Sequence, residues 1–224
     1  MMRTITFAIA FMLCAGMHGQ EYFEGVIQYN VSYQQLNENI SVEYMEQEMG
    51  TAFTAYVKED RYSMIYNAKG FNGWMKIVVR LDKGYSMVEY EKSDTIIKTP
   101  FGPETAKLLQ FERNAAEKRE VMGELCESVT MRYEASQSKA IYESFKGVYY
   151  FSPKYKLNAS LYKEYKESFR NLYAEETGAI SLRNEQEIAP YFISIAEAVS
   201  IDPKEISDKL FEPNPNKVVV TEER

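Results

Sequence analysis

Hydrophobic and polar residues alternate with a period of two along most of the chain. Within Phe23–Tyr33, for example, positions 27, 29, 31 and 33 are apolar or aromatic, and positions 28, 30 and 32 are polar. This alternation predicts a β-strand with one buried face. About eight or nine segments have the pattern; besides Phe23–Tyr33 they are Thr54–Lys58, Arg61–Asn67, Trp74–Leu81, Tyr85–Glu91, Thr95–Thr99, Glu127–Ala135, Lys139–Ser152 and Tyr191–Ile201.

Short polar turns connect several of these segments. Glu59-Asp60, Asp82-Lys83-Gly84 and Lys92-Ser93-Asp94 each leave room only for a hairpin between neighbouring strands. Strands joined by hairpins are antiparallel and adjacent in the sheet. The sequence therefore predicts a meander of antiparallel strands.

Helical periodicity is clearest in Ser160–Ala174. Apolar residues recur there every three or four positions, and charged residues occupy the remaining face. Asn158 or Ser160 can cap the start of this helix, and Gly178 lies just beyond its end. We expect the helix to lie on the sheet with its apolar face towards the strands.

Two further segments are less regular. Ile40–Met49 fits either a helix or a strand, and Gly50 directly after it favours the helix. Pro103–Phe111 fits a helical turn, with Pro103 in its first position, that leads into another strand. With two or three helices, no repeat and no linker rich in Pro, Gly or Ser, the sequence predicts one mainly β domain of the α+β class.

Residues 1–19 have the pattern of an export signal. Arg3 is the only charged residue among them, and an apolar run extends from Ile5 to Ala15. A transmembrane helix needs about 20 apolar residues, so this run is too short to span a bilayer but fits a secretory signal. We interpret 1–19 as a signal peptide cut after Gly19. A cut after Gly16, or a retained first helix or N-terminal anchor, is the alternative.

The remaining residues, 20–224, then form the single domain, with a flexible C-terminal tail expected from about residue 214 to residue 224. Cys14 invites comparison with lipid-modified cysteines. Leu13 before it is not the small residue that such sites require, which argues against a lipid anchor. No later stretch has the length and apolar character of a transmembrane span. We therefore expect an exported protein, periplasmic or secreted.

The composition excludes most catalytic classes once a signal peptide is removed. His18 is the only histidine, and Cys14 and Cys126 are the only cysteines. Without histidine, Ser-His-Asp and Cys-His catalysis and histidine-ligated zinc or haem are impossible. Cys126 then has no disulfide partner, and we expect it to be a small buried hydrophobic residue. The sequence argues against an enzyme and against a bound cofactor or metal.

The acidic residues do not change this picture. Pairs such as Glu89/Glu91 and Glu185/Glu187 fit solvated faces or turns better than the two carboxylates of a glycoside hydrolase. No D-x-D-x-D-G calcium loop and no glycine-rich phosphate-binding motif occurs in the sequence. The formal net charge is -7, and an acidic chain gains nothing from neutralising phosphate groups. Nucleic acid is therefore not an expected partner.

Tyrosine is the residue type in excess, with 18 in the chain. Most of these tyrosines fall on predicted strands or their ends, where the rings can cover a sheet while the hydroxyl groups reach water. Packing in the core and across strands is the commoner role for such residues. The alternative is an aromatic concave cavity that holds an apolar or sugar-like ligand.

Five short motifs resemble a group of exported, uncharacterised envelope proteins of Gram-negative bacteria. The motifs are Phe23-Glu-Gly-Val-Ile-Gln-Tyr29, Tyr56-Val-Lys58, Val121-Met-Gly-Glu-Leu-Cys126, Tyr149-Tyr-Phe-Ser-Pro153 and Lys209-Leu-Phe-Glu-Pro213. The resemblance implies a LolA/LolB-like fold, in which a curved antiparallel sheet forms an open half-barrel with two or three helices on its concave face. The chain lacks a lipobox and matches no lipid-handling motif of those carriers, so the resemblance implies their fold and not their carrier activity.

The leading hypothesis is a non-enzymatic exported protein that binds an apolar or lipid-like ligand in the cavity of the half-barrel. Ser160–Ala174 would be a lid, and the candidate ligand-binding residues are Trp74, Tyr85, Tyr90, Tyr149, Phe151, Tyr165 and Phe169. The alternative is an interaction or structural module that binds another envelope protein through a sheet edge or its acidic surface. An enzyme is the third hypothesis and would have to rely on Glu, Asp, Tyr or Lys.

Overall fold

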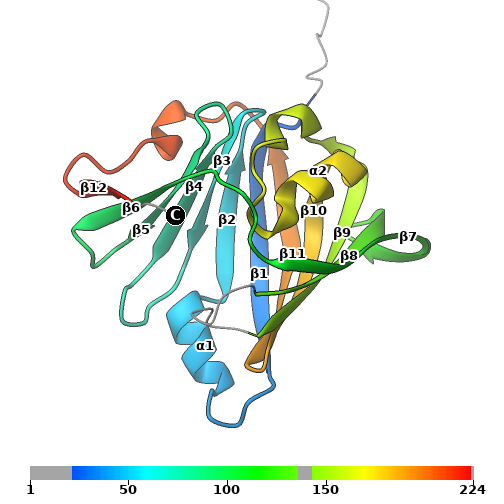
Figure 1. Ribbon diagram of the computed structural model, residues 1–224. Coiled ribbons are helices and arrows are strands. Elements are labelled where there is room, and N and C mark those ends of the chain that lie inside the picture. Colours follow the sequence, from blue (N-terminus) through cyan, green and yellow to red (C-terminus); the bar gives the residue numbers. More distant parts are fainter. Residues whose placement is uncertain (1–21, 136–142, 223–224) are drawn as a thin grey trace, which may run out of the picture.

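The computed structural model describes residues 22–135 and 143–222, and its strands form a single sheet (Figure 1). The strands in chain order are β1 (Gly25–Gln35), β2 (Ala52–Val57), β3 (Arg61–Tyr66), β4 (Met75–Arg80), β5 (Tyr85–Tyr90), β6 (Thr95–Pro100), β7 (Lys107–Val121), β8 (Glu124–Glu134), β9 (Ser144–Lys156), β10 (Ala179–Ala189), β11 (Phe192–Pro203) and β12 (Val218–Thr221).

The sheet is a meander along most of its width. Its strand order is β12-β6-β5-β4-β3-β2-β1-β11-β10-β9-β8-β7, and only the pairing of β12 with β6 is parallel. Tight turns produce this order, as at the predicted turn between β4 and β5. Gly84 has a φ of +69° there, which a residue with a side chain rarely adopts. The predicted antiparallel meander is confirmed.

Two α-helices and three 3₁₀ turns complete the described fold: α1 (Val42–Met49), η1 (Ala159–Tyr162), η2 (Glu167–Phe169), α2 (Arg170–Thr177) and η3 (Asp208–Phe211). Helix α1 starts after Ser41, whose Oγ accepts a hydrogen bond of 3.1 Å from the backbone N–H of Tyr44. It ends at Gly50, which has a φ of 85°. The helix predicted over 40–49 is therefore confirmed.

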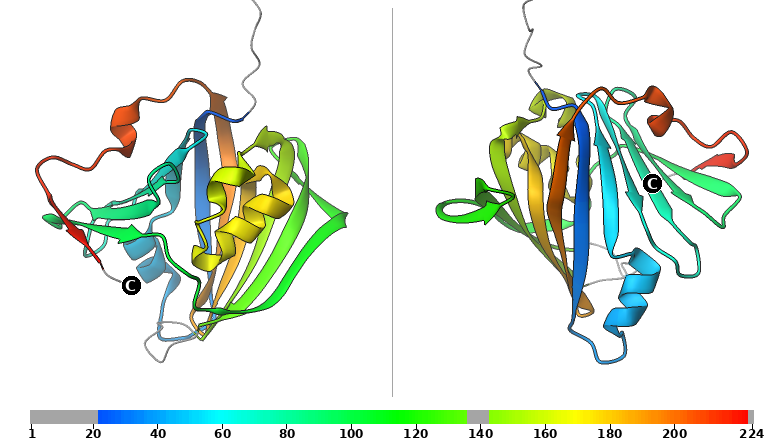
Figure 2. Two further views of the ribbon diagram at one scale, coloured as in Figure 1. Left: turned by 45° about the horizontal axis from the view of Figure 1, so that its top comes forward. Right: turned by 180° about the vertical axis from the view of Figure 1, so that it is seen from behind.

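The sheet is curved and open (Figures 1 and 2). Strands β2–β6 form one wall, β7–β10 form the other, and α2 lies on the concave face. The two edge strands are β12 and β7, which do not pair with each other. The mainly β fold with an open, curved antiparallel sheet is thus confirmed. The expected arrangement of helices is corrected, because α1 lies at one end of β1 and β2 and only α2 and its flanking 3₁₀ turns cover the concave face.

The single helix predicted over Ser160–Ala174 is wrong. The chain forms η1, η2 and α2 instead, and we call residues 159–177 the helical segment. Ser168 and Phe169 have left-handed backbone conformations, with φ of 50° and 57°, and these interrupt the helix. The carboxylate of Glu104 accepts a hydrogen bond of 2.5 Å from the backbone N–H of Ser168 at the interruption.

Residues 101–106, which we call the crossing segment, connect β6 in one wall to β7 in the other across the concave face (Figure 1). The helical turn expected at Pro103 is not formed, and β7 begins at Lys107. Phe101 stacks on Tyr165 of the helical segment, with 4.6 Å between the ring centroids. Together with the hydrogen bond from Ser168 to Glu104, this contact attaches the crossing segment to the helical segment.

Two strands do not show a clear alternation in the sequence. β10 is mostly polar because its charged residues have partners across the sheet: Arg183 forms ion pairs with Glu185 and with Glu197 of β11. β12 lies within the segment that the sequence predicts to be a flexible tail. Its residues 218–221 instead pair with β6, and Val219 lies opposite Ile96.

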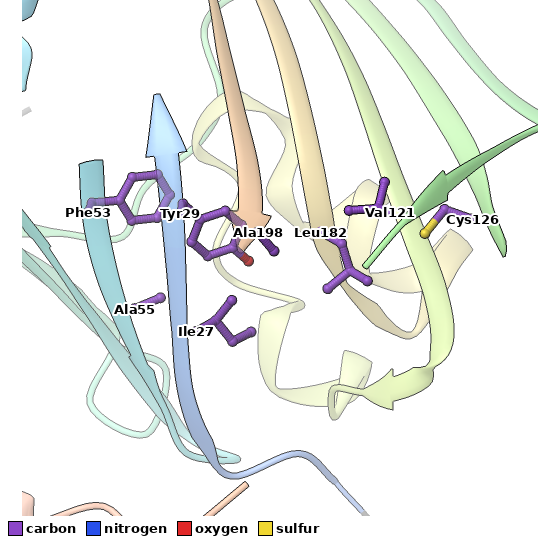
Figure 3. Packing of buried hydrophobic residues seen from close by; sticks show 8 residues of the cluster. All are labelled: Ile27, Tyr29, Phe53, Ala55, Val121, Cys126, Leu182 and Ala198. Carbon is purple, nitrogen blue, oxygen red and sulfur yellow. The ribbon is translucent and has the colours of Figure 1, made fainter. Parts of the chain in front are cut away.

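Buried apolar residues gather in two large clusters. The first joins the two walls and is shown in Figure 3; its buried members are Ile27, Tyr29, Phe53, Ala55, Val121, Cys126, Leu182 and Ala198. The second lies between α2 and strands β8 and β9; its buried members are Val129, Met131, Tyr133, Phe145, Tyr149, Phe151, Tyr173 and Ala179. The helical segment therefore covers the concave side of the second wall.

The C-terminal segment packs on the convex face of the first wall. Phe211 and Ile206 join Val26, Val78, Met87 and Ile96 in a third buried cluster. Beside it, the almost fully buried Arg80 forms ion pairs with Asp82, at 2.7 Å, and with Glu212, at 3.3 Å. This cluster fixes the last residues of the domain to strands that are distant in sequence.

Replacement of Phe211 by alanine tests this attachment. Phe211 is fully buried, so we expect Phe211→Ala to lower the free energy of unfolding by about 3–5 kcal/mol. Chemical denaturation followed by circular dichroism measures the change. Val218→Ala is the control, because Val218 is 65% exposed and its truncation should cost no more than about 0.5 kcal/mol. Equal effects of the two substitutions would contradict the packing described.

Candidate functional site

An unbroken row of apolar residues crosses the concave face of the first wall. The strand register places its members directly opposite one another, and paired residues of neighbouring strands point to the same face. From the centre of the sheet outwards, the row consists of Ile27, Ala55, Met64, Ile77, Val88 and Ile97. We call these six residues the apolar row.

The apolar row is covered at its inner end only. Ile27 is fully buried and Ala55 is 7% exposed, whereas Met64, Ile77 and Val88 are half-buried and Ile97 is 39% exposed. The corresponding face of the second wall is better covered, because the helical segment lies on it and buries Met131, Tyr149 and Phe151. The concave face is thus covered over the second wall and only partly covered over the first.

A second row, next to the first, is mainly aromatic. Tyr29 stacks on Phe53 with 4.5 Å between the ring centroids, and Phe53 lies 4.8 Å from Tyr66. Met75 and Tyr90 continue this row on β4 and β5. The hydroxyl of Tyr29 donates a hydrogen bond of 2.8 Å to the carbonyl oxygen of Ser181 on β10. This row therefore links the open wall to the covered one.

Arg170, the first residue of α2, lies between the two walls. Its guanidinium carbon is 5.4 Å from the centre of the Tyr149 ring on β9. The guanidinium group also interacts electrostatically with Tyr62 on β3, Tyr133 on β8 and Tyr165 of the helical segment. Since Tyr62 neighbours the apolar row on β3, the positive charge lies next to the open part of the concave face.

The tyrosines around Arg170 remain neutral over the usual pH range. Burial raises the pKa of Tyr66 to about 12, although the nearby Arg170 charge opposes the shift. Burial also raises the pKa of Tyr62 and of Tyr162 well above the ordinary tyrosine value. These groups can donate hydrogen bonds, but they supply no negative charge to balance the arginine.

Two cavities adjoin the helical segment. One of about 240 Å³ is lined by Phe101, Gly102, Pro103, Glu164 and Lys166, where the crossing segment meets the helical segment. The other, of about 350 Å³, is lined by Ala159, Ser160, Lys163, Asn171 and Glu175. Arg170 and the apolar row line neither of them, so the candidate site is the open concave face and not one of these hollows.

Four of the seven candidate ligand-binding residues gather at the helical segment. Tyr149 and Phe151 are 1% exposed on β9, and Tyr165 is 7% exposed. Phe169 lies 5.3 Å from Tyr133, centroid to centroid. Tyr149 and Tyr165 lie close to Arg170, and Phe169 directly precedes it in the chain. Phe151, like Tyr149, belongs to the second buried cluster.

The other three candidates lie on the first wall. Tyr90 faces the concave side, next to Met75. Tyr85 faces the convex side, where Lys98 Nζ lies 4.2 Å from its ring centre. Trp74 lies beside Lys217 Nζ, 5.2 Å from its ring centre. The structure thus brings Tyr90 to the concave face and does not bring Tyr85 or Trp74 there.

Sequence reasoning misses Arg170 and the apolar row. Arg170 has the spacing of a solvent-facing residue in a continuous helix, and only the interruption at Ser168 and Phe169 turns it inward. The apolar row could have been found by aligning consecutive hairpin strands, because each strand contributes one member at the middle of its inward face.

Cys126 is buried, as predicted, and it forms no disulfide with any of the described residues. Burial raises the pKa of its thiol to about 11, so the thiol stays protonated at neutral pH. Within 22–135 and 143–222, no group of three or more His, Cys, Asp or Glu residues could hold a metal ion. No helix in the same ranges has the length and apolar character needed to cross a membrane. The predicted signal peptide, Cys14 and His18 lie outside the described residues.

Comparison with known proteins reveals similarity of fold at very low sequence identity. The crystal structure of an uncharacterized conserved protein from Thermus thermophilus matches with a TM-score of 0.47 and 8% identity, over 89% of this chain and 91% of that one. The crystal structure of a LolA superfamily protein from Nitrosomonas europaea matches with a TM-score of 0.39 and 7% identity, over 87% of this chain and 92% of that one.

The matches thus include a LolA superfamily protein, as the sequence resemblance predicts. Both TM-scores lie below 0.5, so neither match assigns a role to any residue of this chain. No family model and no curated protein matches the chain.

Titration of the tyrosines tests the burial described here. A phenol with a raised pKa in the folded protein stabilises the fold fully below its unfolded value of about 10, and this contribution is lost as the pH rises towards the folded value. Burial raises the pKa of Tyr29, Tyr62, Tyr66 and Tyr173 in this way. We therefore expect tyrosinate absorbance to rise in two steps, the second coinciding with unfolding. A single step near pH 10 in the folded protein would contradict their burial.

Proposed function

We propose that this protein binds an apolar, lipid-like small molecule on the concave face of its sheet and performs no chemistry on it. The observation that carries the proposal is the half-covered apolar row. Met64, Ile77, Val88 and Ile97 form a continuous surface that the rest of the described chain covers only in part. A contiguous apolar surface inside a concave sheet is a common setting for small apolar ligands.

The energetics favour a ligand over water at this surface. Burial of apolar area contributes about 25 cal/mol per Å², so complete burial of one large aliphatic side chain is worth about 1.5–3 kcal/mol. Several half-exposed side chains lie side by side here, and an acyl chain on top of them would remove them from water together. The hydrogen-bonded sheet behind the row holds these side chains in place before any ligand arrives, which limits the entropy lost on binding.

The proposed setting is outside the cytoplasm. The pattern of residues 1–19 supports export, and the protein would act in the periplasm or as a secreted protein. Because a lipid-like molecule is poorly soluble in water, a soluble protein that shields its acyl chain would keep it dispersed there. The buried thiol of Cys126 is compatible with an oxidising compartment, since it is inaccessible to other cysteines.

A charge placed on the apolar row tests the proposal. Ile97→Glu adds a carboxylate to the exposed end of the row, and we expect it to weaken the binding of an apolar fluorophore at least about tenfold, since a buried charge without a partner is costly. Val219→Glu is the matched control, because Val219 is 42% exposed and lies in the neighbouring strand on the opposite face. Binding titrations measure the effect, and native mass spectrometry of the purified protein detects any lipid that copurifies.

Three results would contradict the proposal. The first is that the wild-type protein binds no apolar fluorophore and carries no lipid. The second is that the Ile97→Glu variant binds the fluorophore as tightly as the wild type. The third is that the two glutamate variants weaken binding equally, which would place the fluorophore elsewhere. Circular dichroism spectra establish that both variants are folded before the comparison is made.

A further inference from the structure

Arg170 differs from the other arginines of the described chain. Those that pair with at least one carboxylate, whether buried or exposed, are Arg61, Arg80, Arg113, Arg119 and Arg183, and the remaining Arg132 is exposed to solvent. Within residues 22–135 and 143–222, Arg170 forms no ion pair with a carboxylate. Its neighbours are aromatic, and its guanidinium group lies over the ring of Tyr149. Arg170 therefore carries a half-buried positive charge without a negative partner in this part of the chain.

A charge of this kind is costly to maintain. Partial removal from water destabilises an ion, and an attractive aromatic ring offsets only part of that loss. Arginine cannot escape by losing its proton, since its guanidinium group stays charged in proteins. The neutral tyrosines nearby provide oxygen atoms and ring faces but no counter-charge. An anionic ligand would supply this counter-charge.

A second polar group on the same face lacks a partner. Asn184 lies directly opposite Tyr149 in the pairing of β10 with β9, so the two side chains share the concave face. Its Oδ1 is buried, and no described residue forms a hydrogen bond with it. A side-chain amide can turn to present either its oxygen or its NH₂ group. A polar head group near Tyr149 could therefore contact both Arg170 and Asn184.

We infer that Arg170 binds the anionic head group of a single-chain amphiphile whose acyl chain lies along the apolar row. The inference rests on the function proposed above and specifies the chemistry and orientation of the ligand. The head group is a carboxylate or a phosphate, because both match the planar, two-pronged donor geometry of a guanidinium group.

The geometry also gives the direction and length of the ligand. Arg170 interacts with Tyr62 and Tyr66, which flank Met64 on β3, so the head group lies at the β3 end of the open surface. From there the row continues over β4 and β5 to Ile97 on β6. Neighbouring strands are about 4.8 Å apart, and three such steps span about 14 Å. That length corresponds to an extended acyl chain of medium length.

Binding of dodecanoate and dodecanol tests the inference. The two molecules have the same chain, and only dodecanoate is charged at neutral pH. We expect the wild-type protein to bind dodecanoate at least about tenfold more tightly than dodecanol, because only the carboxylate pairs with the guanidinium group. Arg170→Met should abolish this preference by weakening dodecanoate binding while leaving dodecanol binding unchanged. Arg170→Lys should retain part of the preference, because lysine keeps the charge and loses the two-pronged geometry.

Arg119→Gln is the matched control. Arg119 also lies over a tyrosine ring, 5.6 Å from that of Tyr150, but it is paired with Glu185. This variant should bind dodecanoate like the wild type. Dodecyl phosphate and inorganic phosphate extend the comparison. If dodecyl phosphate binds and inorganic phosphate does not, the site requires both the head group and the acyl chain. If inorganic phosphate binds equally well, the site is a free anion site and the inference is overturned.

The failures of the inference and of the proposed function are distinguishable. If dodecanol and dodecanoate bind equally well to the wild type, and Ile97→Glu weakens both, the apolar site exists and the role of Arg170 is refuted. If neither molecule binds the wild type, the proposed function fails with it. If Arg170→Met does not fold, the preference of the wild type and the effect of Arg170→Lys still decide the question.

Discussion

The structure depends on how the concave face of one curved sheet is covered. A twelve-stranded sheet that bends into an open half-barrel turns every second side chain inward, and the inward positions of its first wall are largely apolar or aromatic. The helical segment lies mainly on the second wall, where α2 packs against β8 and β9, and on the first wall it reaches Tyr62 of β3. The unequal cover leaves the outer part of the apolar row open, and the candidate site is a direct consequence of it.

The apolar residues of the convex face are covered in a different way. Its third buried cluster is covered by the C-terminal segment, and Arg80 lies beneath that cover with two carboxylates as partners. A buried charge that has oppositely charged partners is compatible with a stable fold, whereas a buried charge without such a partner lacks a counter-charge. The contrast between Arg80 and Arg170 is therefore informative, because the two arginines belong to one domain and lie on opposite faces of its sheet.

Local patterns predict the strands and miss what depends on distant contacts. The period of two and the short turns identify the hairpins of the first wall, since each hairpin is specified by residues close in sequence. β10 escapes detection because its charges have partners across the sheet, such as Glu197 for Arg183. The interruption at Ser168 is equally invisible, because it involves Glu104 in the crossing segment. The aromatic candidates at the helical segment follow from a local apolar pattern, so the sequence predicts them. The inward position of Arg170 depends on the interruption, so the sequence does not predict it.

The place of β1 in the sheet has a consequence for how the chain folds. Strands β2–β6 and β7–β11 are two meanders, each built from neighbours in sequence, and β1 joins them by pairing with β2 and with β11. The pairing of β1 with β11 closes the longest loop in the domain, so it carries the greatest entropic cost and is expected to form late. A chain crossing a membrane N-terminus first would present β1 long before its second neighbour emerged. Completion of the half-barrel would then have to wait for nearly the whole chain.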